Sequence, residues 1–282
     1  MLVTAKEMLQ KAREGKYAIG AFNVENMEMV MAVLAAAEAK NSPVIMQTTP
    51  GTIKYAGVDY YYANVAAAAK RSSVPVVMHL DHGDSFQRAM AAYRAGYTSI
   101  MIDGSKLPFE DNIALTKRVV DACHPGGVYV EGELGKVGGK EDDLEGDDDN
   151  PYTDPEEAKI FVEKTGVDYL AIGVGTAHGV YKGIPKVNTD LIATIHDMVD
   201  VPLVLHGTSG VPDEQVITAV KNGICKVNYA TDLRIAFTRG AKDFMADHPE
   251  AFDPKKYSQQ GMVEVQKYVE QKIEVCGSVG KA

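Results

Sequence analysis

Three histidines of this chain share one local sequence, because a glycine follows each of them. They are His82, His178 and His206. Three imidazoles that meet at one point and leave a fourth position open are the ligand set of a catalytic zinc ion. A glycine beside each ligand lets the backbone turn tightly and lets a substrate approach the ion. Any one of the three alone would be interpreted as a buried structural histidine, but the three together favour a metal site.

Acidic residues lie close to these histidines in the sequence or on an expected strand. Asp81 directly precedes His82, so its carboxylate could reach a metal-bound substrate without serving as a ligand, which suits proton transfer. The alternative for Asp81 is to orient an imidazole as a hydrogen-bond partner. Glu131 and Glu133 alternate along one expected strand and therefore face the same side. They could hold a second or displaced metal position, or form ion pairs with neighbouring cations.

A possible lid follows these two glutamates. Gly138 and Gly139 are typical of a hinge, and a very acidic segment comes after them. We therefore expect the first part of this segment to close over the site and to bring Glu141 with it. The run of aspartates further on is interpreted as a solvated loop.

Two further segments favour a phosphate site. They are 207–210, with the sequence Gly-Thr-Ser-Gly, and 228–232, with the sequence Asn-Tyr-Ala-Thr-Asp. In barrels of alternating strands and helices, the loops after strands seven and eight often bind phosphate through backbone N–H groups. Each fragment alone is also a common turn, but the two at these positions favour phosphate binding.

The elements that must position these residues alternate between strand and helix. Short apolar or β-branched runs predict eight strands, at Ala18–Val24, Pro43–Thr49, Pro75–Asp81, Ser99–Asp103, Val128–Leu134, Tyr169–Gly175, Pro202–His206 and Ile224–Ala230. Amphipathic patterns predict helices between them, at Glu28–Ala39, Asp84–Ala95, Pro108–Ala122, Pro155–Thr165, Thr189–Met198 and Asp213–Lys221. Such units are typical of a parallel sheet covered on both faces, and eight of them favour an α/β fold, the (β/α)8 TIM barrel. The first strand lacks the glycine-rich dinucleotide fingerprint of an open sheet.

Polar residues end nearly every expected strand, and barrel active sites lie at these C-terminal ends. The strand-end residues include Asn23, Thr49, Asp103 and Asn228. We expect Asn23 and Thr49 to contact a substrate there. We also expect one domain, 1–282, in which 235–282 forms a C-terminal helical extension available for packing or oligomer contacts.

Composition limits the classes of partner. The chain of 282 residues is 45% hydrophobic and 24% charged, which suits one large globular core. A net charge of −10 argues against nucleic acid or an anionic membrane, but not against a sugar phosphate held by backbone N–H groups. Three cysteines without a paired pattern, no signal sequence and no apolar run of transmembrane length predict a soluble cytoplasmic protein.

Five segments together resemble the class II ketose-bisphosphate aldolases over essentially the whole chain. They are 79–82, 131–142, 175–179, 205–210 and 226–231. Gly-Thr-Ala-His-Gly at 175–179, Thr49–Thr52 and the ending Cys276–Ser278 resemble the tagatose-bisphosphate subgroup. Gly83, after the first metal histidine, resembles the fructose-bisphosphate subgroup. The resemblance implies a zinc-dependent lyase that acts on one of these two sugars.

The same resemblance implies roles for individual residues. It implies zinc on the three histidines with Glu133 as an alternate ligand, proton transfer by Asp81, and a loop acid at Glu141. Substrate contacts are implied at Gly179, Gly207, Ser209, Asn228 and Thr231, to which we add Ala230 of the same loop. Lys255 stands where relatives usually carry an arginine that reaches the distal phosphate, often across a subunit interface; lysine keeps the charge but loses the bidentate fork. We also expect a monovalent cation (Na+ or K+) as a possible second cofactor. For the assembly, we expect a homodimer or homotetramer.

The predicted reaction is reversible cleavage of tagatose- or fructose-1,6-bisphosphate to dihydroxyacetone phosphate and glyceraldehyde 3-phosphate, as in glycolysis and related carbohydrate metabolism. Zinc would stabilise the enediolate left when C3–C4 breaks, Asp81 would accept the C4 hydroxyl proton, and Glu141 would protonate the enediolate carbon. A Schiff-base mechanism is disfavoured because strand six contains no lysine, although Lys226 lies on strand eight. Two alternatives stay open: a zinc hydrolase with Asp81 as base, and a non-catalytic sugar-phosphate-binding barrel.

Overall fold

The computed structural model describes residues 1–135, 137–141, 144–145, 152–179, 181 and 183–282, with only the backbone described for 139–141 and 144–145. Eight strands close into one barrel in the order β1-β11-β10-β8-β5-β4-β3-β2, and every neighbouring pair is parallel. Their bounds are β1 Ile19–Asn23, β2 Val44–Thr48, β3 Val76–Gly83, β4 Ser99–Ile102, β5 Tyr129–Leu134, β8 Tyr169–Ile172, β10 Leu203–Leu205 and β11 Ile224–Tyr229. The predicted (β/α)8 barrel is confirmed.

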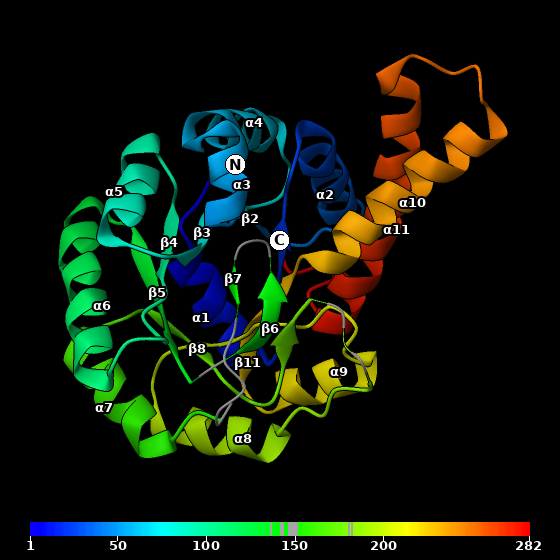
Figure 1. Cartoon of the computed structure of the whole chain (residues 1–282). Helices are drawn as coiled ribbons and strands as arrows, with labels where there is room; N and C mark the ends of the chain where they lie inside the picture. Colours follow the sequence, from blue (N-terminus) through cyan, green and yellow to red (C-terminus); the bar gives the residue numbers. More distant parts are fainter. Residues whose placement is uncertain (136, 142–143, 146–151, 180, 182) are drawn as a thin grey trace.

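Helices surround these strands (Figure 1). They are α2 Met27–Ala39, α3 Pro50–Ala56, α4 Val58–Arg71, α5 Phe86–Ala95, α6 Phe109–Cys123, α7 Pro155–Thr165, α8 Thr189–Met198, α9 Asp213–Lys221, α10 Thr231–Asp247 and α11 Pro254–Cys276, with a short 3₁₀ turn at His124–Gly126. The sequence patterns did not predict α3 and α4. These two helices are separated at Gly57, whose φ of 89° suits glycine.

The bottom of the barrel is closed by the apolar face of an amphipathic helix, α1 (Ala5–Gly15). Its buried residues Met8 and Leu9 join the inward-facing side chains of the strands, such as Ile19, Val77 and Val204, in one cluster. A second and larger cluster lies between the outer faces of the strands and the helices. Apolar side chains thus fill the bottom of the barrel, and the buried polar network of the strands lies above them.

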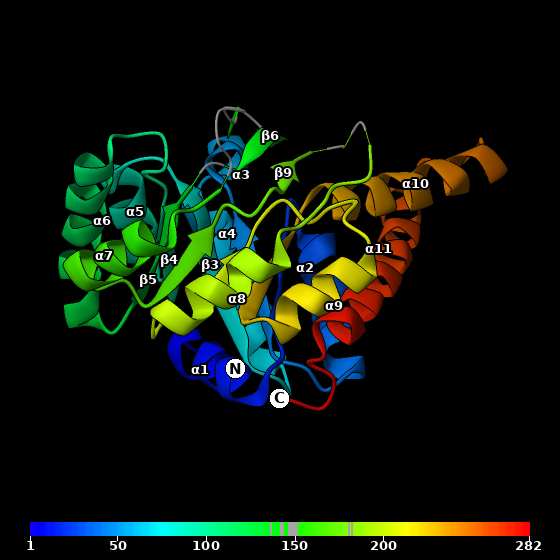
Figure 2. The same cartoon turned by 90° about the horizontal axis from the view of Figure 1, so that it is seen from below.

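A small sheet flanks that upper end. It consists of β6 (Gly138–Glu141), β7 (Leu144–Glu145) and β9 (Ala177–His178). β6 pairs with β7 in the antiparallel sense and with β9 in the parallel sense. Figure 2 shows β6 and β9 on the side of the molecule opposite α1 and the two termini.

Two long helices form the C-terminal extension. α10 and α11 pack against each other, and α11 also packs against α2. The connection between them projects from the barrel as an arm (Figure 1, upper right). α10 begins at Thr231, directly after β11, so one continuous helix both completes the barrel and enters the arm. Among the described residues no helix has the length and apolarity needed to cross a membrane.

Candidate metal centre and active site

The three glycine-flanked histidines meet at the mouth of the barrel. His82 is the penultimate residue of β3, His206 directly follows β10, and His178 ends β9 of the small sheet. Each offers a ring nitrogen, and these atoms lie within 4.8 Å of one another. The ring of His82 is 4.8 Å from that of His178 and 4.7 Å from that of His206, measured between centroids. This is the convergence that a three-histidine metal site requires.

Hydrogen bonds assign the ligand atoms of two of these histidines. His82 Nδ1 lies 3.0 Å from Asp103 Oδ2, and His206 Nε2 lies 2.8 Å from Glu131 Oε1. Because a carboxylate accepts, each of these nitrogens carries the hydrogen. The other two ring nitrogens, His82 Nε2 and His206 Nδ1, face each other at 2.9 Å, the distance of a hydrogen bond. When the proton between them leaves, two lone pairs point at one position, so the donor set fits a metal ion that would take the place of that proton.

Glycines are required at two of the three ligands by the crowding of the backbone. A Cβ on Gly83 would lie 2.4 Å from the carbonyl oxygen of Met101 on β4. Gly207 has a φ of 64°, and a Cβ there would lie 2.7 Å from the carbonyl oxygen of Ala177. His82 itself has a φ of 48°, which is unusual for a residue with a side chain and is found at functional sites.

Burial and neighbouring carboxylates set the protonation of the ligands. Burial, followed by the charge of His82, lowers the pKa of His178 and of His206 well below the ordinary value, so both imidazoles are neutral donors. Burial acts in the same direction on His82, but the carboxylates of Asp81, Asp103 and Glu133 outweigh it and raise the pKa of His82. The proton on His82 must leave before that ring can bind a metal.

Glu133 and Asp103 form a second group of potential ligands with His82. Glu133 Oε2 lies 3.7 Å from His82 Nδ1 and 3.8 Å from His206 Nδ1, and it has no hydrogen-bond partner among the described residues. Burial and then the charge of Asp103 raise the pKa of Glu133. A buried carboxyl oxygen without a donor is costly to ionise, and a bound cation would offset that cost.

Asp81 is held by three amide groups at the base of the mouth. Its Oδ2 accepts from Asn23 at 3.0 Å and from Gln47 at 3.1 Å, and its Oδ1 accepts from Asn228 at 3.0 Å. Its Oδ1 is 3.9 Å from His82 Nε2, too far for a shared proton but adjacent to the metal position. Burial opposes ionisation, but nearby positive charge and the Asn23 amide outweigh it and lower the pKa of Asp81. Asp81 is therefore an oriented, ionised carboxylate.

The two predicted phosphate loops form one recess with the third histidine. It is lined by His178, Gly179, Gly207, Thr208, Ser209, Asn228, Ala230 and Thr231. The N-terminus of α10 opens into it; the N-cap residue Ala230 offers no side-chain acceptor, and Ser209 Oγ accepts from Asp232 N–H at 3.4 Å. A helix N-terminus with glycine-rich loops beside it suits an anion such as phosphate.

A tyrosine ties the loops of this recess together. Tyr181 Oη donates to the carbonyl oxygen of Gly207 and accepts from the backbone N–H of Ala177, both at 2.6 Å. His178 and His206 are the neighbours of these two backbone groups. Tyr181 was not predicted from the sequence, since a single tyrosine in a loop carries no distinctive signal.

The other predicted site residues are placed differently. Thr49 is buried at the end of β2, where its side chain caps α3 by accepting from Thr52 N at 3.2 Å. Glu141 ends β6, and its side chain lies outside the described part of the structure. Lys255 lies on the arm, where its side chain is 86% exposed and its Nζ is 2.9 Å from Asp253.

Two further site residues were not among the predicted ones, Gln47 and Lys226, and a third, Asp103, was predicted at a strand end without a role. Gln47 and Lys226 are fully buried within strands that are otherwise largely apolar. A buried polar group must have a partner, so each was a recognisable signal, but the sequence does not say which partner it meets. Asp103 was recognised at the end of β4, and the structure adds its hydrogen bond to His82 Nδ1.

Comparisons with known proteins agree with this geometry. The family model of class-II fructose-bisphosphate aldolases matches residues 3–281. The chain is similar to the YdjI aldolase of Escherichia coli K12, with 37% identity, a TM-score of 0.89 and full coverage of both chains. It is also similar to a putative fructose-1,6-bisphosphate aldolase of Coccidioides immitis (30% identity, TM-score 0.87, 98% and 96% coverage). A third similar structure is the fructose-bisphosphate aldolase of Campylobacter jejuni (25% identity, TM-score 0.83, 100% and 97% coverage).

Proposed function

Because the chain belongs to the class II fructose-bisphosphate aldolase family and is thus a lyase, we propose that it reversibly cleaves tagatose- or fructose-1,6-bisphosphate to two triose phosphates. The metal would be zinc, held by His82, His178 and His206. One observation carries the proposal: the three imidazoles, an ionised Asp81 and an anion-binding recess share one barrel mouth. A hydrolase would need the metal and a base but not the recess, and a sensor would need no oriented base.

The proposed chemistry divides between the metal and Asp81. When bound, the ion would supply the positive charge that stabilises the electrons released onto the ketose as C3–C4 breaks. Asp81 would accept the proton of the C4 hydroxyl during cleavage and return it during condensation. Three amide donors support this role, because they hold both oxygens of Asp81 in place while leaving the group ionised.

Glu141 is our candidate for the acid that protonates the carbon at C3 of the leaving triose. Its support is the position of its strand: in the pairing of β6 with β9, Gly139 lies opposite the metal ligand His178. Movement of the segment after Gly138 would therefore bring the acid toward the centre or away from it.

The recess would bind the phosphate on C1 of the ketose. Gly179, Gly207 and Ser209 would contribute from the two loops, and Ala230 and Thr231 from the start of α10. Asn23 and Asn228, through the network on Asp81, would contact hydroxyls of the sugar, and Thr49 would lie beyond them at the end of β2. Lys255 of a second copy would bind the distal phosphate of the sugar. A Na+ or K+ ion near the C1 phosphate would help to neutralise its charge.

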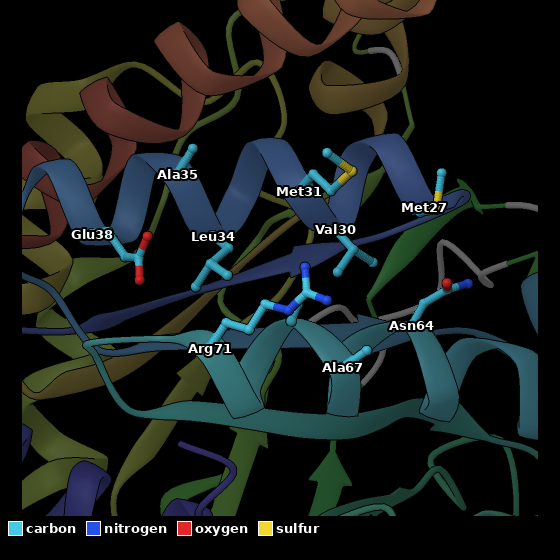
Figure 3. A pocket seen from close by; sticks show the side chains of 10 residues that line it. Met27, Val30, Met31, Leu34, Ala35, Glu38, Asn64, Ala67 and Arg71 are labelled. Atoms are coloured by element: carbon cyan, nitrogen blue, oxygen red, sulfur yellow. The ribbon is translucent and has the colours of Figure 1, made fainter. Parts of the chain in front are cut away.

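We also propose a homodimer or homotetramer located in the cytoplasm. The apolar groove between α2 and α4, shown in Figure 3, supports self-association: it is lined by Met27, Val30, Met31 and Leu34, and the first and third of these are 52% and 49% exposed. The arm offers the exposed Phe252. Each copy thus presents an apolar groove and a protruding apolar side chain, Phe252. In a two-fold dimer, Phe252 of each copy could pack into the groove of the other.

A comparison of the two epimers tests the proposed function. Purified protein is incubated with fructose- or tagatose-1,6-bisphosphate, and both glyceraldehyde 3-phosphate and inorganic phosphate are measured. We expect triose phosphate from at least one sugar and no inorganic phosphate. Inorganic phosphate alone would indicate a hydrolase, and tight binding without any product would indicate a sensor.

A further inference from the structure

Lys226 is a fully buried cation that takes no direct part in the proposed cleavage. Its side chain, on β11, points into the barrel and has no solvent exposure. Burying an ammonium group is costly unless a carboxylate compensates for it. Its partner is Glu131 on β5, with Nζ 2.9 Å from Oε2, and Glu131 is equally buried.

The second oxygen of Glu131 leads to the metal centre. Glu131 Oε1 lies 2.8 Å from Nε2 of the ligand His206. Oε2, which receives the lysine, is also 3.4 Å from Nε2 of His79. One carboxylate therefore joins a buried lysine to a metal ligand, and each oxygen has a fixed partner.

This arrangement determines which nitrogen of His206 can bind the metal. His206 Nε2 has two polar neighbours, Glu131 Oε1 at 2.8 Å and Asn228 Nδ2 at 3.3 Å, and Asn228 also donates to Asp81 at 3.0 Å. The shorter contact is to the carboxylate, which accepts the hydrogen of Nε2 and leaves the lone pair on Nδ1, the atom directed at His82. A neutral imidazole without such an acceptor would exchange between two tautomers, and only one of them presents Nδ1 as a ligand. The orientation of Glu131 depends in turn on Lys226.

We propose that Lys226 is a positioning residue that acts through Glu131 on His206, fixing the tautomer and the orientation in which His206 binds the metal. The inference rests on the proposed metal site. It also gives Lys226 a role other than Schiff-base formation, since an ammonium group held by Glu131 at zero exposure has neither a free electron pair nor a path to the substrate.

The test measures metal binding rather than activity. Zinc affinity is determined by competition with a chromophoric chelator for the wild type, Lys226→Met, Glu131→Gln and the double variant. The side-chain ¹⁵N resonances of His206 in the zinc-loaded proteins report its tautomer. Lys272→Met is the matched control, because Lys272 is also a buried lysine, 2.6 Å from Asp213, but it lies on α11 outside the centre.

We expect Lys226→Met and Glu131→Gln each to weaken zinc binding by roughly 10- to 100-fold and to disturb the His206 tautomer, whereas Lys272→Met leaves both unchanged. The zinc affinity of the double variant should equal that of whichever single variant binds zinc less tightly, because both changes break the same chain of contacts. Lys226→Gln, which keeps a donor for Glu131, should retain the fold and lose less affinity than Lys226→Met.

Two results would overturn the inference alone. The first is that Lys226→Met binds zinc as tightly as the wild type and shows the same His206 tautomer. If Lys226→Met does not fold, the same result for Lys226→Gln would overturn the inference. The second is a double variant in which the two losses multiply, because Lys226 would then act independently of Glu131. A wild-type protein that binds no zinc would instead overturn the proposed metal site, and the inference with it.

Discussion

Asn228 and Asp81 are joined by a hydrogen bond of 3.0 Å across the barrel, from the end of β11 to the end of β3. The two residues are far apart in the sequence but meet because a closed barrel brings all its strand ends to one rim. The same Asn228 lines the anion recess. The residue proposed to move protons is thus held by a residue that also lines the recess proposed to bind phosphate.

Asp81→Asn should separate catalysis from metal binding. The amide keeps the size of the side chain but cannot accept a proton, so we expect turnover to fall by about 10²- to 10⁴-fold while zinc content stays at the wild-type level. Metal analysis and the coupled cleavage assay measure the two effects. Asp84→Asn, on the half-exposed Asp84 that pairs with Arg88, is the control and should leave both values unchanged. If zinc were lost in proportion to activity, Asp81 would hold the metal site rather than transfer protons.

Gly207→Ala should damage the centre through the backbone. The left-handed conformation at φ 64° costs an L-residue about 1–2 kcal/mol, and the new methyl group would meet the carbonyl oxygen of Ala177 at 2.7 Å. We expect a lower melting temperature together with weaker zinc binding and a higher KM. Gly183→Ala is the matched control, because a Cβ there meets nothing within 4 Å. Equal behaviour of the two variants would contradict the close approach of the loops that carry His178 and His206.

Zinc affinity should rise with pH. In the metal-free protein burial lowers the pKa of His82, but Asp81, Asp103 and Glu133 outweigh it and raise that pKa above its ordinary value. The metal-free protein therefore holds a proton that the metal-bound protein does not, and a higher pH favours the metal-bound form. Calorimetry between about pH 6 and about pH 8, in buffers of different ionisation enthalpy, measures both the affinity and the protons released. An affinity that is constant over this range, without proton release, would count against a protonated His82.

Met31→Glu should weaken self-association. Met31 lines the α2/α4 groove and is 49% exposed, so a charge there would oppose burial against a second copy. Light scattering during size-exclusion chromatography should show a shift toward the monomer at micromolar concentration. Ile160→Glu, on α7 and also partly exposed, serves as the control and should not change the mass. An unchanged mass for Met31→Glu would remove the groove as the contact surface.

The sequence predicted the barrel well because each strand carries its own signal. The expected strand Val128–Leu134 and the observed β5, Tyr129–Leu134, differ by one residue, since an apolar run between two helices can form little else. The small sheet was not predicted. Its strands β7 and β9 have two residues each, too few to show any periodicity, and they depend on contacts made above the mouth.

The pairing of site residues across the barrel was harder to predict than the residues themselves. His82, His206 and Asp81 were recognisable from their types and their places at strand ends. Glu131 contacts both Lys226 and His206 because of the register of β5, β10 and β11 around the barrel. The sequence of one strand alone does not determine that register. No role could therefore be assigned to Lys226 from the sequence; its proposed role follows from the contacts made in the fold.

Removal and return of the metal test the central claim most directly. The protein is stripped with a chelator until no metal is detected, and cleavage of fructose- and tagatose-1,6-bisphosphate is followed before and after stoichiometric zinc is added. We predict that the stripped protein keeps its fold but releases no triose phosphate, and that zinc restores cleavage of at least one sugar. Full cleavage by the metal-free protein, or none after zinc is restored, would contradict a metal-dependent aldolase built on His82, His178 and His206.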